Sequence, residues 1–391
     1  MKVLMVTPYL PYPLYSGGQV RLYNLIKNLS SKHEISLFSF IRHEDERKWV
    51  AELSKYCQKV EVFKKRKPWD PETLFRTAVS PYPLLMTMYD FPQVRKKLQE
   101  EIKAQSYDLI HVECFYAMQN LPKVDLPLVL AEQNVEYLVY QRFVQNFRFW
   151  IFRPLMYLDV LKIKFWEKHF WQKAKVLVAV SKEEKKLMGL SGVEIVPNGA
   201  DVKYFEEWVA KKDSHPTVVF VGNFRWIQNK DALRFLYAEI WPKVKDKIPE
   251  AKLLVVGRDM PKGLKDDLGD DVVLEEKMED VRQAYQRADL LLSPVRVGGG
   301  TSFKVLEAMT SSLPVVTTPL GIEGIEARDG QEVIVRQSPR ELAEAVVKLL
   351  RDEKARKEMG AKAQKLMEEK YDWGKISAKL SRVWEEAGSS K

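Results

Sequence analysis

Short, continuous apolar runs alternate along the chain with longer segments in which apolar residues recur every three or four positions. Such runs are typical of strands buried on both faces of a parallel sheet, and the segments between them are typical of covering helices. The alternation predicts doubly wound α/β domains. The predicted strands are Val3–Thr7, Ile35–Phe40, Val60–Phe63, Leu109–Glu113, Leu128–Glu132 and Val176–Val180 in the first half, and Thr217–Val221, Leu253–Val256, Val272–Leu274, Leu290–Leu292 and Leu313–Val316 in the second.

A charged stretch at 206–216 contains few apolar residues and is predicted to be a linker. We therefore expect one domain over residues 1–205 and a second over 214–372, a division that suits a chain of 391 residues. Residues 373–391 follow as a final amphipathic helix. The proline-rich and aromatic segment 68–90 is interpreted as an irregular segment at the edge of a cleft.

The composition excludes several classes of protein. No run of 18 apolar residues is present, so no membrane-spanning helix is expected. The only two cysteines, Cys57 and Cys114, provide neither a disulfide framework nor a metal cluster. A reducing cytoplasm is the expected compartment, with the inner face of the membrane as a possible place of peripheral attachment.

The positive charge is concentrated in the first half of the chain. Residues 1–200 contain 30 basic and 21 acidic residues, a net charge of +9, whereas the remainder contains 33 of each. A one-sided excess indicates an anionic partner for this half, such as a membrane surface or a phosphorylated or lipid-linked acceptor. No nucleic-acid-binding signature is present, so nucleic acid is not expected as a partner.

Residues 139–175 contain eight basic and only two acidic residues, with Phe, Trp and Tyr between them. Long cationic side chains beside aromatic rings suit the headgroup layer of an anionic membrane. The same pattern also suits a helix whose aromatic residues fill the domain core and whose lysines face water. The sequence leaves both interpretations open.

The most informative stretch is SPVRVGGGTSFKVLEAM, which starts at Ser293. It predicts a strand end, a loop with three glycines at 298–300, and a helix capped by Thr301 or Ser302. Amides at a glycine loop and a helix N-terminus form an anion site, and Lys304 and Glu307 add a cation and a carboxylate. The alternative is a plain glycine turn before a core helix.

This stretch resembles the signature of the family 4 retaining glycosyltransferases, which have the GT-B fold. In that family two glutamates bracket the loop and helix. The second matches Glu307, followed here by a small-residue turn and PVV, while the first would fall at Gly299 and is absent. The form with three glycines and a lysine resembles a glycine-rich branch of the family.

The resemblance implies two Rossmann-like domains facing a cleft, with the final helix returning to the first domain. The second domain would bind a UDP- or GDP-linked sugar, with no metal and no cofactor. Arg225 and Lys304 would act in catalysis by neutralising the diphosphate. The implied donor-binding residues of this domain are Asn223, Lys230, Met278, Gly299, Gly300, Thr301, Ser302 and Glu307.

The first domain has its own candidates at the carboxyl ends of strands, where ligands bind in open α/β sheets. Gly17 and Gly18 match a glycine pair that family members carry near the donor phosphates. Gln133 stands where relatives often have a histidine, so it and Glu132 are the catalytic candidates of this domain. His111 is either a base or a buried structural residue, and Glu113 ends the same strand.

The implied activity is sugar transfer from the nucleotide donor to a glycan or lipid-linked acceptor, as in polysaccharide biosynthesis. Two alternatives remain, of which the first is left open by the departures of Gly299 and Gln133 from the family pattern and the second shares the same fold. One is a catalytically silent GT-B partner that binds nucleotide or glycan, and the other is a sugar-nucleotide epimerase. Neither the acceptor nor the oligomeric state follows from the sequence.

Overall fold

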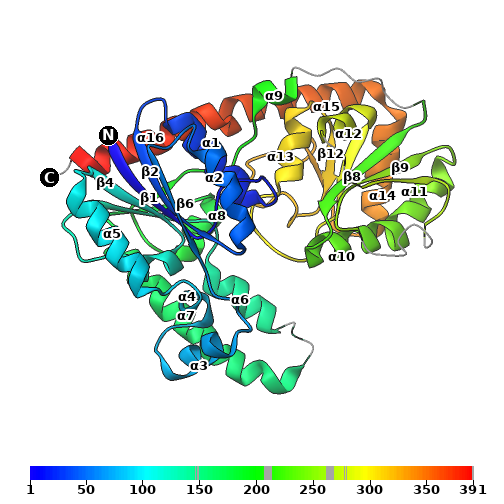
Figure 1. The fold of residues 1–391 in the computed structure, drawn as a ribbon. Coiled ribbons are helices and arrows are strands. Elements are labelled where there is room, and N and C mark those ends of the chain that lie inside the picture. The colour runs from blue at the N-terminus through cyan, green and yellow to red at the C-terminus, as the bar shows by residue number, and fades with distance from the viewer. Residues whose placement is uncertain are drawn as a thin grey trace. The chain divides into compact units, whose positions relative to one another are not determined.

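The computed structural model describes residues 1–145, 147, 149–206, 214–260, 268–276, 278 and 280–389. The chain forms two compact units: unit 1 consists of Met1–Pro197 and Ile376–Lys391, and unit 2 of Asn198–Lys375. Each unit is built on one parallel sheet, with helices between most of the successive strands (Figure 1). This confirms the predicted fold class of two Rossmann-like α/β sheets. Residues 207–213 lie outside the described part of the chain, so the linker stays a prediction.

The sheet of unit 1 has seven strands: β1 (Lys2–Thr7), β2 (Glu34–Ile41), β3 (Lys59–Lys64), β4 (Leu109–Glu113), β5 (Leu128–Glu132), β6 (Val176–Ala179) and β7 (Val193–Ile195). Their order in the sheet is β3-β2-β1-β4-β5-β6-β7. Val3 on β1 pairs in parallel register with Ile35 on one side and Leu109 on the other. The chain thus changes direction across the sheet between β1 and β4, and such switch points are where α/β sheets bind ligands.

Local sequence signals set both ends of helix α8 in unit 1. Ser181 Oγ accepts the amide of Glu184 at the start of α8, and Gly189 follows its end at a φ of +67°. The helices are α1 (Gly17–Leu29), α2 (Val50–Leu53), α3 (Pro71–Val79), α4 (Leu84–Thr87), α5 (Pro92–Ala104), α6 (Glu136–Gln145), α7 (Arg153–Lys173) and α8 (Lys182–Met188), with short 3-10 helices η1 (Glu44–Trp49), η2 (Phe115–Asn120) and η3 (Trp150–Phe152).

Unit 2 repeats this plan with six parallel strands: β8 (Thr217–Asn223), β9 (Lys252–Arg258), β10 (Val272–Glu276), β11 (Leu290–Ser293), β12 (Val315–Thr317) and β13 (Ile334–Val335). Their order is β10-β9-β8-β11-β12-β13, so its switch point lies between β8 and β11. The helices are α9 (Val202–Glu206), α10 (Ile227–Phe235), α11 (Trp241–Lys247), α12 (Arg282–Arg287), α13 (Phe303–Thr310), α14 (Pro339–Arg351) and α15 (Glu353–Leu366), with π-helical turns η4 (Leu236–Ile240) and η5 (Met367–Tyr371).

The last helix, α16 (Trp373–Ser389), returns to unit 1 as expected. The indole Nε1 of Trp384 donates to Nδ1 of His111 on β4 at 3.1 Å. A second hydrogen bond of 2.7 Å joins Ser381 Oγ and His33 Nε2. The buried apolar side of α16 consists of Trp373, Ile376, Leu380, Val383, Trp384 and Ala387. The amphipathic pattern of the last residues is therefore satisfied mainly against unit 1.

The segment 68–90 contains the helices α3 and α4, so its interpretation as an irregular segment is wrong. Pro71 stands in the first turn of α3, where its missing amide removes no helical hydrogen bond, and Pro83 directly precedes α4. Together with α6 and α7, these helices form an extension at one end of unit 1 (Figure 1).

Within the described residues, no helix combines the length and the apolar composition that crossing a bilayer requires. The same residues contain no group of three or more histidine, cysteine, aspartate or glutamate side chains arranged to bind a metal ion. Cys57 and Cys114 are buried free thiols.

Candidate functional site

The loop from β11 to α13 lies at the carboxyl edge of the unit 2 sheet, at its switch point. The φ angles of Gly298 and Gly300 are +113° and +81°, a backbone conformation that favours glycine. Ser302 occupies the N-cap position of α13 without a capping hydrogen bond from its side chain, and Oγ1 of Thr301 has no hydrogen-bond partner within the described part of the chain. The predicted start of the helix at Ser302 is confirmed, but its side chain does not cap the helix, so the first-turn amides of α13 can serve an anionic ligand.

Two charged side chains leave α13 three positions apart, and other elements hold both. Nζ of Lys304 donates to Oδ1 of Asn229 on α10 at 2.6 Å and lies 4.6 Å from the centre of the Phe220 ring. Oε2 of Glu307 accepts a hydrogen bond of 2.8 Å from the hydroxyl of Tyr285 on α12. Partners from β8, α10 and α12 thus position both groups before any ligand binds.

Burial brings the pKa values of these two groups close together. It lowers the pKa of Lys304 to about 7, against the opposing effect of the Glu307 carboxylate. It raises the pKa of Glu307 to about 7, although the hydrogen bond from Tyr285 and the charge of Lys304 act in the other direction. Each group can therefore change its charge near neutral pH when a ligand binds beside it.

Three buried oxygen atoms in this region have no hydrogen-bond partner among the described residues. They are Oγ of Ser293 at the end of β11, Oγ1 of Thr301 in the glycine loop and Oε2 of Glu323 in the loop after β12. Oγ1 of Thr317 donates to the carbonyl oxygen of Ser293 at 2.7 Å, which ties the start of the Glu323 loop to β11. Buried polar atoms without partners are rare, and a polar ligand would satisfy them.

Asn223, at the end of β8, is linked to Lys304 by hydrogen bonds through Asn229. Its carbonyl oxygen accepts a hydrogen bond of 2.8 Å from Nδ2 of Asn229, whose Oδ1 binds Lys304. Its own Oδ1 accepts the backbone amide of Arg225 at 2.9 Å. The structure therefore brings Asn223 and Lys304 together through Asn229.

The other candidates of unit 2 lie further from this cluster. The Arg225 side chain is 68% exposed and its Nε lies 3.7 Å from Asp259. Lys230, on α10, is also exposed. Met278 is partly buried and packs on the apolar cluster that includes Tyr285 and Leu306. These positions allow Arg225 and Lys230 to move toward an anion, and among the described residues no hydrogen bond joins their side chains to Lys304 or Glu307.

In unit 1, Gly17 and Gly18 begin α1 beside the loop that follows β1. A Cβ atom on Gly18 would lie 1.9 Å from the hydroxyl oxygen of Tyr9 and 2.7 Å from Oε1 of Gln133. Such distances are far inside van der Waals contact, so a larger residue here would force the Tyr9 and Gln133 side chains to shift. The structure thus brings the predicted residues Gly18 and Gln133 together.

A chain of hydrogen bonds leads from Gln133 into unit 1. Oε1 of Gln133 accepts from the Tyr9 hydroxyl at 2.9 Å, and its Nε2 donates to Oε2 of Glu113 at 3.2 Å. Nε2 of His111 lies 3.2 Å from Oε1 of Glu113. Because the Trp384 indole can only donate, Nδ1 of His111 must accept, and Nε2 carries the proton given to Glu113. Of its two interpretations, His111 is the buried structural residue.

The buried Glu113 is held in its ionised form. Burial alone would raise its pKa, but the hydrogen bond from His111 and the positive charge of Arg21 lower it below the ordinary value. Arg21 is itself buried on α1, and its guanidinium donates to the carbonyl oxygen of Pro197 at 2.8 Å. A carboxylate and a guanidinium thus lie beneath the switch point of unit 1.

Glu132 has surroundings unlike those of its neighbour Gln133. Its side chain is 1% exposed, and Oε1 accepts hydrogen bonds from the amide of Phe115 at 3.1 Å and from Nε1 of Trp171 at 3.2 Å. Burial and the nearby Glu167 carboxylate raise its pKa well above the ordinary value. The two catalytic candidates of unit 1 are therefore not brought into one polar site.

The sequence interpretation did not select several residues that shape these sites: Tyr9, Arg21, Asn229, Tyr285 and Glu323. Glu323 had a usable signal, because it lies in a glycine-containing loop directly after a predicted strand. Tyr285 and Arg21 had none, since a single polar residue within a helix does not indicate what it faces.

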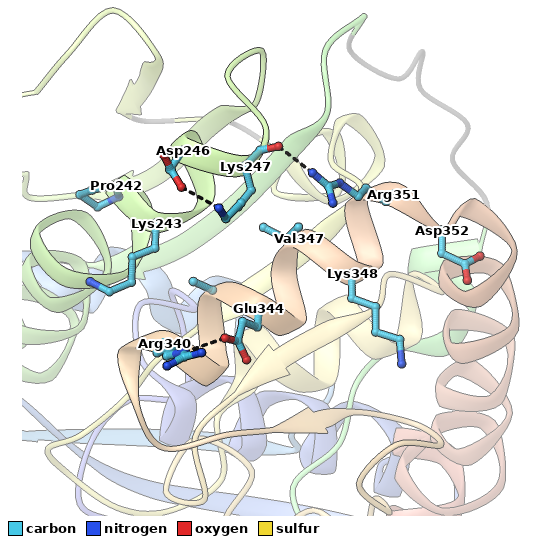
Figure 2. A pocket seen from close by; sticks show the side chains of 11 residues that line it. Pro242, Lys243, Asp246, Lys247, Arg340, Glu344, Val347, Lys348, Arg351 and Asp352 are labelled. Carbon is cyan, nitrogen blue, oxygen red and sulfur yellow. Dashed lines mark hydrogen bonds and ion pairs between the residues drawn. The ribbon is translucent and has the colours of Figure 1, made fainter.

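A hollow of about 920 Å³ lies between α11 and α14 of unit 2, away from these candidates (Figure 2). Four of its charged side chains form two ion pairs, Arg340 with Glu344 and Lys247 with Asp246. Arg351 also donates to the Lys247 carbonyl oxygen at 2.9 Å, which joins the two helices. The residues that line the hollow include none of the candidates of the switch-point sites, so it is not the predicted donor site.

Two family models match successive parts of the chain. Residues 15–204 match the model described as Glycosyltransferase Family 4, and residues 215–352 match the model described as Glycosyl transferases group 1. The chain is a glycosyltransferase of the group 1 and family 4 type. In this glycosyltransferase, the first match includes Gly18 and Gln133, and the second includes the glycine loop and α13.

Two relatives illustrate how far the similarity extends. The glycosyltransferase is 22% identical to an uncharacterized 44.6 kDa protein in the cps region of Klebsiella pneumoniae, over 97% of this chain and 98% of the relative. It is 24% identical to a phosphatidyl-myo-inositol mannosyltransferase of Mycolicibacterium smegmatis, over 75% of each chain.

Solved structures support the fold. Sucrose-phosphate synthase from Thermosynechococcus elongatus matches the glycosyltransferase with a TM-score of 0.74 and 15% identity over 100% of both chains. Anabaena HepE in complex with UDP-glucose matches with a TM-score of 0.66 and 14% identity, over 99% of this chain and 100% of that chain. At these identities the structural matches show the GT-B fold alone.

Proposed function

We propose that this glycosyltransferase moves a sugar from a UDP- or GDP-linked donor to a glycan or lipid-linked acceptor, with retention of the anomeric configuration. The arrangement around α13 carries the proposal, because uncapped amides, Lys304 and Glu307 lie at one sheet edge. The similar fold of HepE in complex with UDP-glucose supports this donor chemistry.

In this proposal the glycine loop and the first turn of α13 bind the diphosphate. The amides of Gly299, Gly300, Thr301 and Ser302 would donate to phosphate oxygens, aided by the helix dipole. Lys304 would supply the positive charge that stabilises the leaving diphosphate, which makes a metal ion unnecessary. Uptake of a proton by Lys304, whose pKa is about 7, would accompany binding.

The remaining donor contacts come from groups around this anion site. Glu307, oriented by the hydroxyl of Tyr285, would accept hydrogen bonds from the ribose hydroxyls. Arg225 and Lys230 would add charge at the rim, since their long exposed side chains can reach toward phosphate. Met278 would pack beside the nucleobase.

In unit 1, we assign Gln133 an orienting role toward the reacting sugar. Its two amide atoms are held by Tyr9 and Glu113, so the position of the side chain is defined. Gly17 and Gly18 let the backbone approach a substrate closely. Glu132 is assigned a structural role, because its carboxyl group binds Phe115 and Trp171 within the core.

Glu323 is our candidate for the acid that the chain lacks at Gly299. The glycine loop provides no carboxylate, whereas Oε2 of Glu323 is buried with no partner among the described residues, on a loop tied to the end of β11. Its oxygen would accept hydrogen bonds from sugar hydroxyls of the donor.

Glu323→Gln keeps the size of this side chain and removes its charge. We expect kcat/KM for transfer to fall about 10- to 150-fold, as for loss of a charged hydrogen bond, while affinity for UDP or GDP alone is unchanged. Glu326→Gln, close by and ion-paired with Lys370 at the surface, is the matched control. An equal loss of nucleotide affinity would remove Glu323 from the sugar site.

Nucleotide release from UDP- and GDP-sugars, measured with and without an added lipid-linked or glycan acceptor, tests the proposed function. Transfer predicts release that depends on the acceptor and a sugar product with the same anomeric configuration, identified by NMR. A change of the sugar without nucleotide release would indicate an epimerase. Nucleotide binding without any turnover would indicate a silent GT-B partner, and both outcomes would contradict the proposal.

A further inference from the structure

Helix α7 has apolar side chains on two sides. One side faces the core, where Val160, Ile163, Phe170 and Trp171 are buried. The other side is exposed to solvent: Leu155, Leu158, Leu161 and Phe165 are 69%, 58%, 61% and 64% exposed, as is the preceding Ile151 at 66%. Their spacing of three and four residues places them on one stripe of the helix. The inner side of α7 agrees with the interpretation of the 139–175 segment as a helix packed on the core, whereas the outer stripe needs its own explanation.

Neighbouring elements extend this outer stripe. In η3, Trp150 and Phe152 are 71% and 55% exposed, and on α3 Phe75 and Val79 are both 67% exposed. Helix α3 is tied to α7, because Nζ of Lys162 donates to the carbonyl oxygens at the end of α3, to Thr77 at 2.8 Å and to Ser80 at 2.9 Å. We call the exposed set the apolar face: Phe75, Val79, Trp150, Ile151, Phe152, Leu155, Leu158, Leu161 and Phe165.

The exposed charges of α7 are all positive. Lys164, Lys168 and Lys173 are exposed, whereas Glu167 is fully buried and accepts the amides of Glu136 and Tyr137 at 2.7 and 3.0 Å. The other acid, Asp159, is partly buried and accepts the amide of Leu84. A hollow of about 380 Å³ on this helix is lined by Leu161, Lys164, Phe165, Lys168, His169 and Gln172.

We propose that the apolar face docks on an anionic lipid bilayer. Exposed aromatic and leucine side chains beside lysines suit the boundary between acyl chains and headgroups. The hollow between Lys164 and Lys168 has the charge and the size to receive a lipid phosphate group. A second copy of the chain is the less favourable occupant, because a symmetric contact would place two positively charged surfaces against each other.

This surface is separate from sugar transfer, since none of its residues belongs to either switch-point site. Docking would nevertheless suit an acceptor that is carried on a lipid. The proposal can therefore fail while the proposed transfer holds, and transfer can fail while docking holds.

Flotation with vesicles of phosphatidylcholine alone, or of phosphatidylcholine and phosphatidylglycerol in equal parts, tests the proposal with the full chain. We expect the wild type to float with the anionic vesicles at low salt and to be released as salt increases. Equal flotation with both vesicles, or with neither, would overturn the proposal.

Two variants separate charge from apolar contact. Lys164→Glu with Lys168→Glu should weaken anionic vesicle binding about 30-fold or more, since each lysine near an anionic surface contributes about a factor of five. Leu158→Ser with Phe165→Ser should weaken it about 10-fold by removing inserted apolar area. The control, Lys354→Glu with Lys357→Glu on α15, makes the same charge change at exposed sites and should bind like the wild type.

Thermal melting and sedimentation velocity complete the test. All three variants alter exposed side chains, so unchanged melting temperatures are expected and confirm that the variants fold. One outcome would assign the apolar face to a second copy and reject the bilayer. In it, the wild type is a dimer that does not bind vesicles, and Leu158→Ser with Phe165→Ser converts it to a monomer. Equal loss of binding in the control pair would reject the specific role of α7.

Discussion

The switch points of the two sheets are built alike but differ in how their polar groups are satisfied. In unit 1, Tyr9, Gln133, Glu113, His111 and Trp384 bind one another in an unbroken chain of hydrogen bonds. In unit 2, an uncapped helix start lies on a loop that also carries buried oxygens without partners among the described residues. The same architecture therefore supports a rigid scaffold in one unit and an open polar site in the other.

This difference indicates where ligand binding contributes most free energy. Polar groups that already bind each other gain little from a new partner, whereas buried groups without one gain nearly the full value of a hydrogen bond. We therefore expect nucleotide affinity to depend on unit 2, and the rate of transfer to depend also on the geometry that unit 1 maintains.

The largest effect is expected from Glu307→Ala. Loss of a charged hydrogen-bonding partner should weaken UDP or GDP binding by about 1–3 kcal/mol, measured by isothermal titration calorimetry. Tyr285→Phe removes only the hydroxyl that orients Glu307, so its effect should be smaller. If Glu307→Ala bound UDP or GDP as tightly as the wild type, the nucleotide would bind elsewhere. The proposed difference between the two units would then be wrong.

Gly18→Ala should lower the rate of sugar transfer more than it lowers the affinity for nucleotide. The new Cβ would lie 1.9 Å from the Tyr9 hydroxyl oxygen and 2.7 Å from Oε1 of Gln133, so the hydrogen-bonded chain must shift. Overpacking of this kind costs about 1–3 kcal/mol of folding free energy, and we expect a lower melting temperature and a lower kcat.

Adding Tyr9→Phe to Gly18→Ala removes the closest clashing atom. It should restore part of the melting temperature and part of kcat. If Gly18→Ala weakened UDP binding as strongly as transfer, the division of roles between the units would be wrong.

The smallest effect is the pH dependence of nucleotide affinity. Because burial lowers the pKa of Lys304 to about 7, this group is a cation below that pH and neutral above it. Affinity for UDP should therefore fall about threefold to tenfold as the pH rises through 7. The Lys304→Met variant should bind UDP more weakly, and its affinity should change less with pH. If the affinity of the variant fell as steeply with pH as that of the wild type, Lys304 would be excluded as the source of the pH dependence.

Most of the fold could be predicted from the sequence because buried parallel strands are continuous apolar runs. All eleven predicted strands overlap strands of the structure, whereas β7 and β13, with three and two residues, are too short for a recognisable pattern. The helices α3 and α4 were missed because proline in a first turn was taken as a sign of irregular structure.

The two sites differed in how far sequence could predict them. The glycine loop, Lys304 and Glu307 lie within one short segment, so local reasoning could find them. Tyr9 and Gln133 are 124 positions apart, and only the folded chain shows that they bind each other. That the buried Oε2 of Glu323 has no partner in the described parts of the chain is likewise a property of the packing, which no local pattern expresses.

The return of α16 to unit 1 has a consequence for biosynthesis. His33 and His111 receive their partners Ser381 and Trp384 from the end of the chain. During translation, unit 2 can emerge complete while the first unit still lacks its closing helix. The N-terminal part, although made first, is the last to be finished, and until then its apolar surface for α16 stays open to chaperones and proteases.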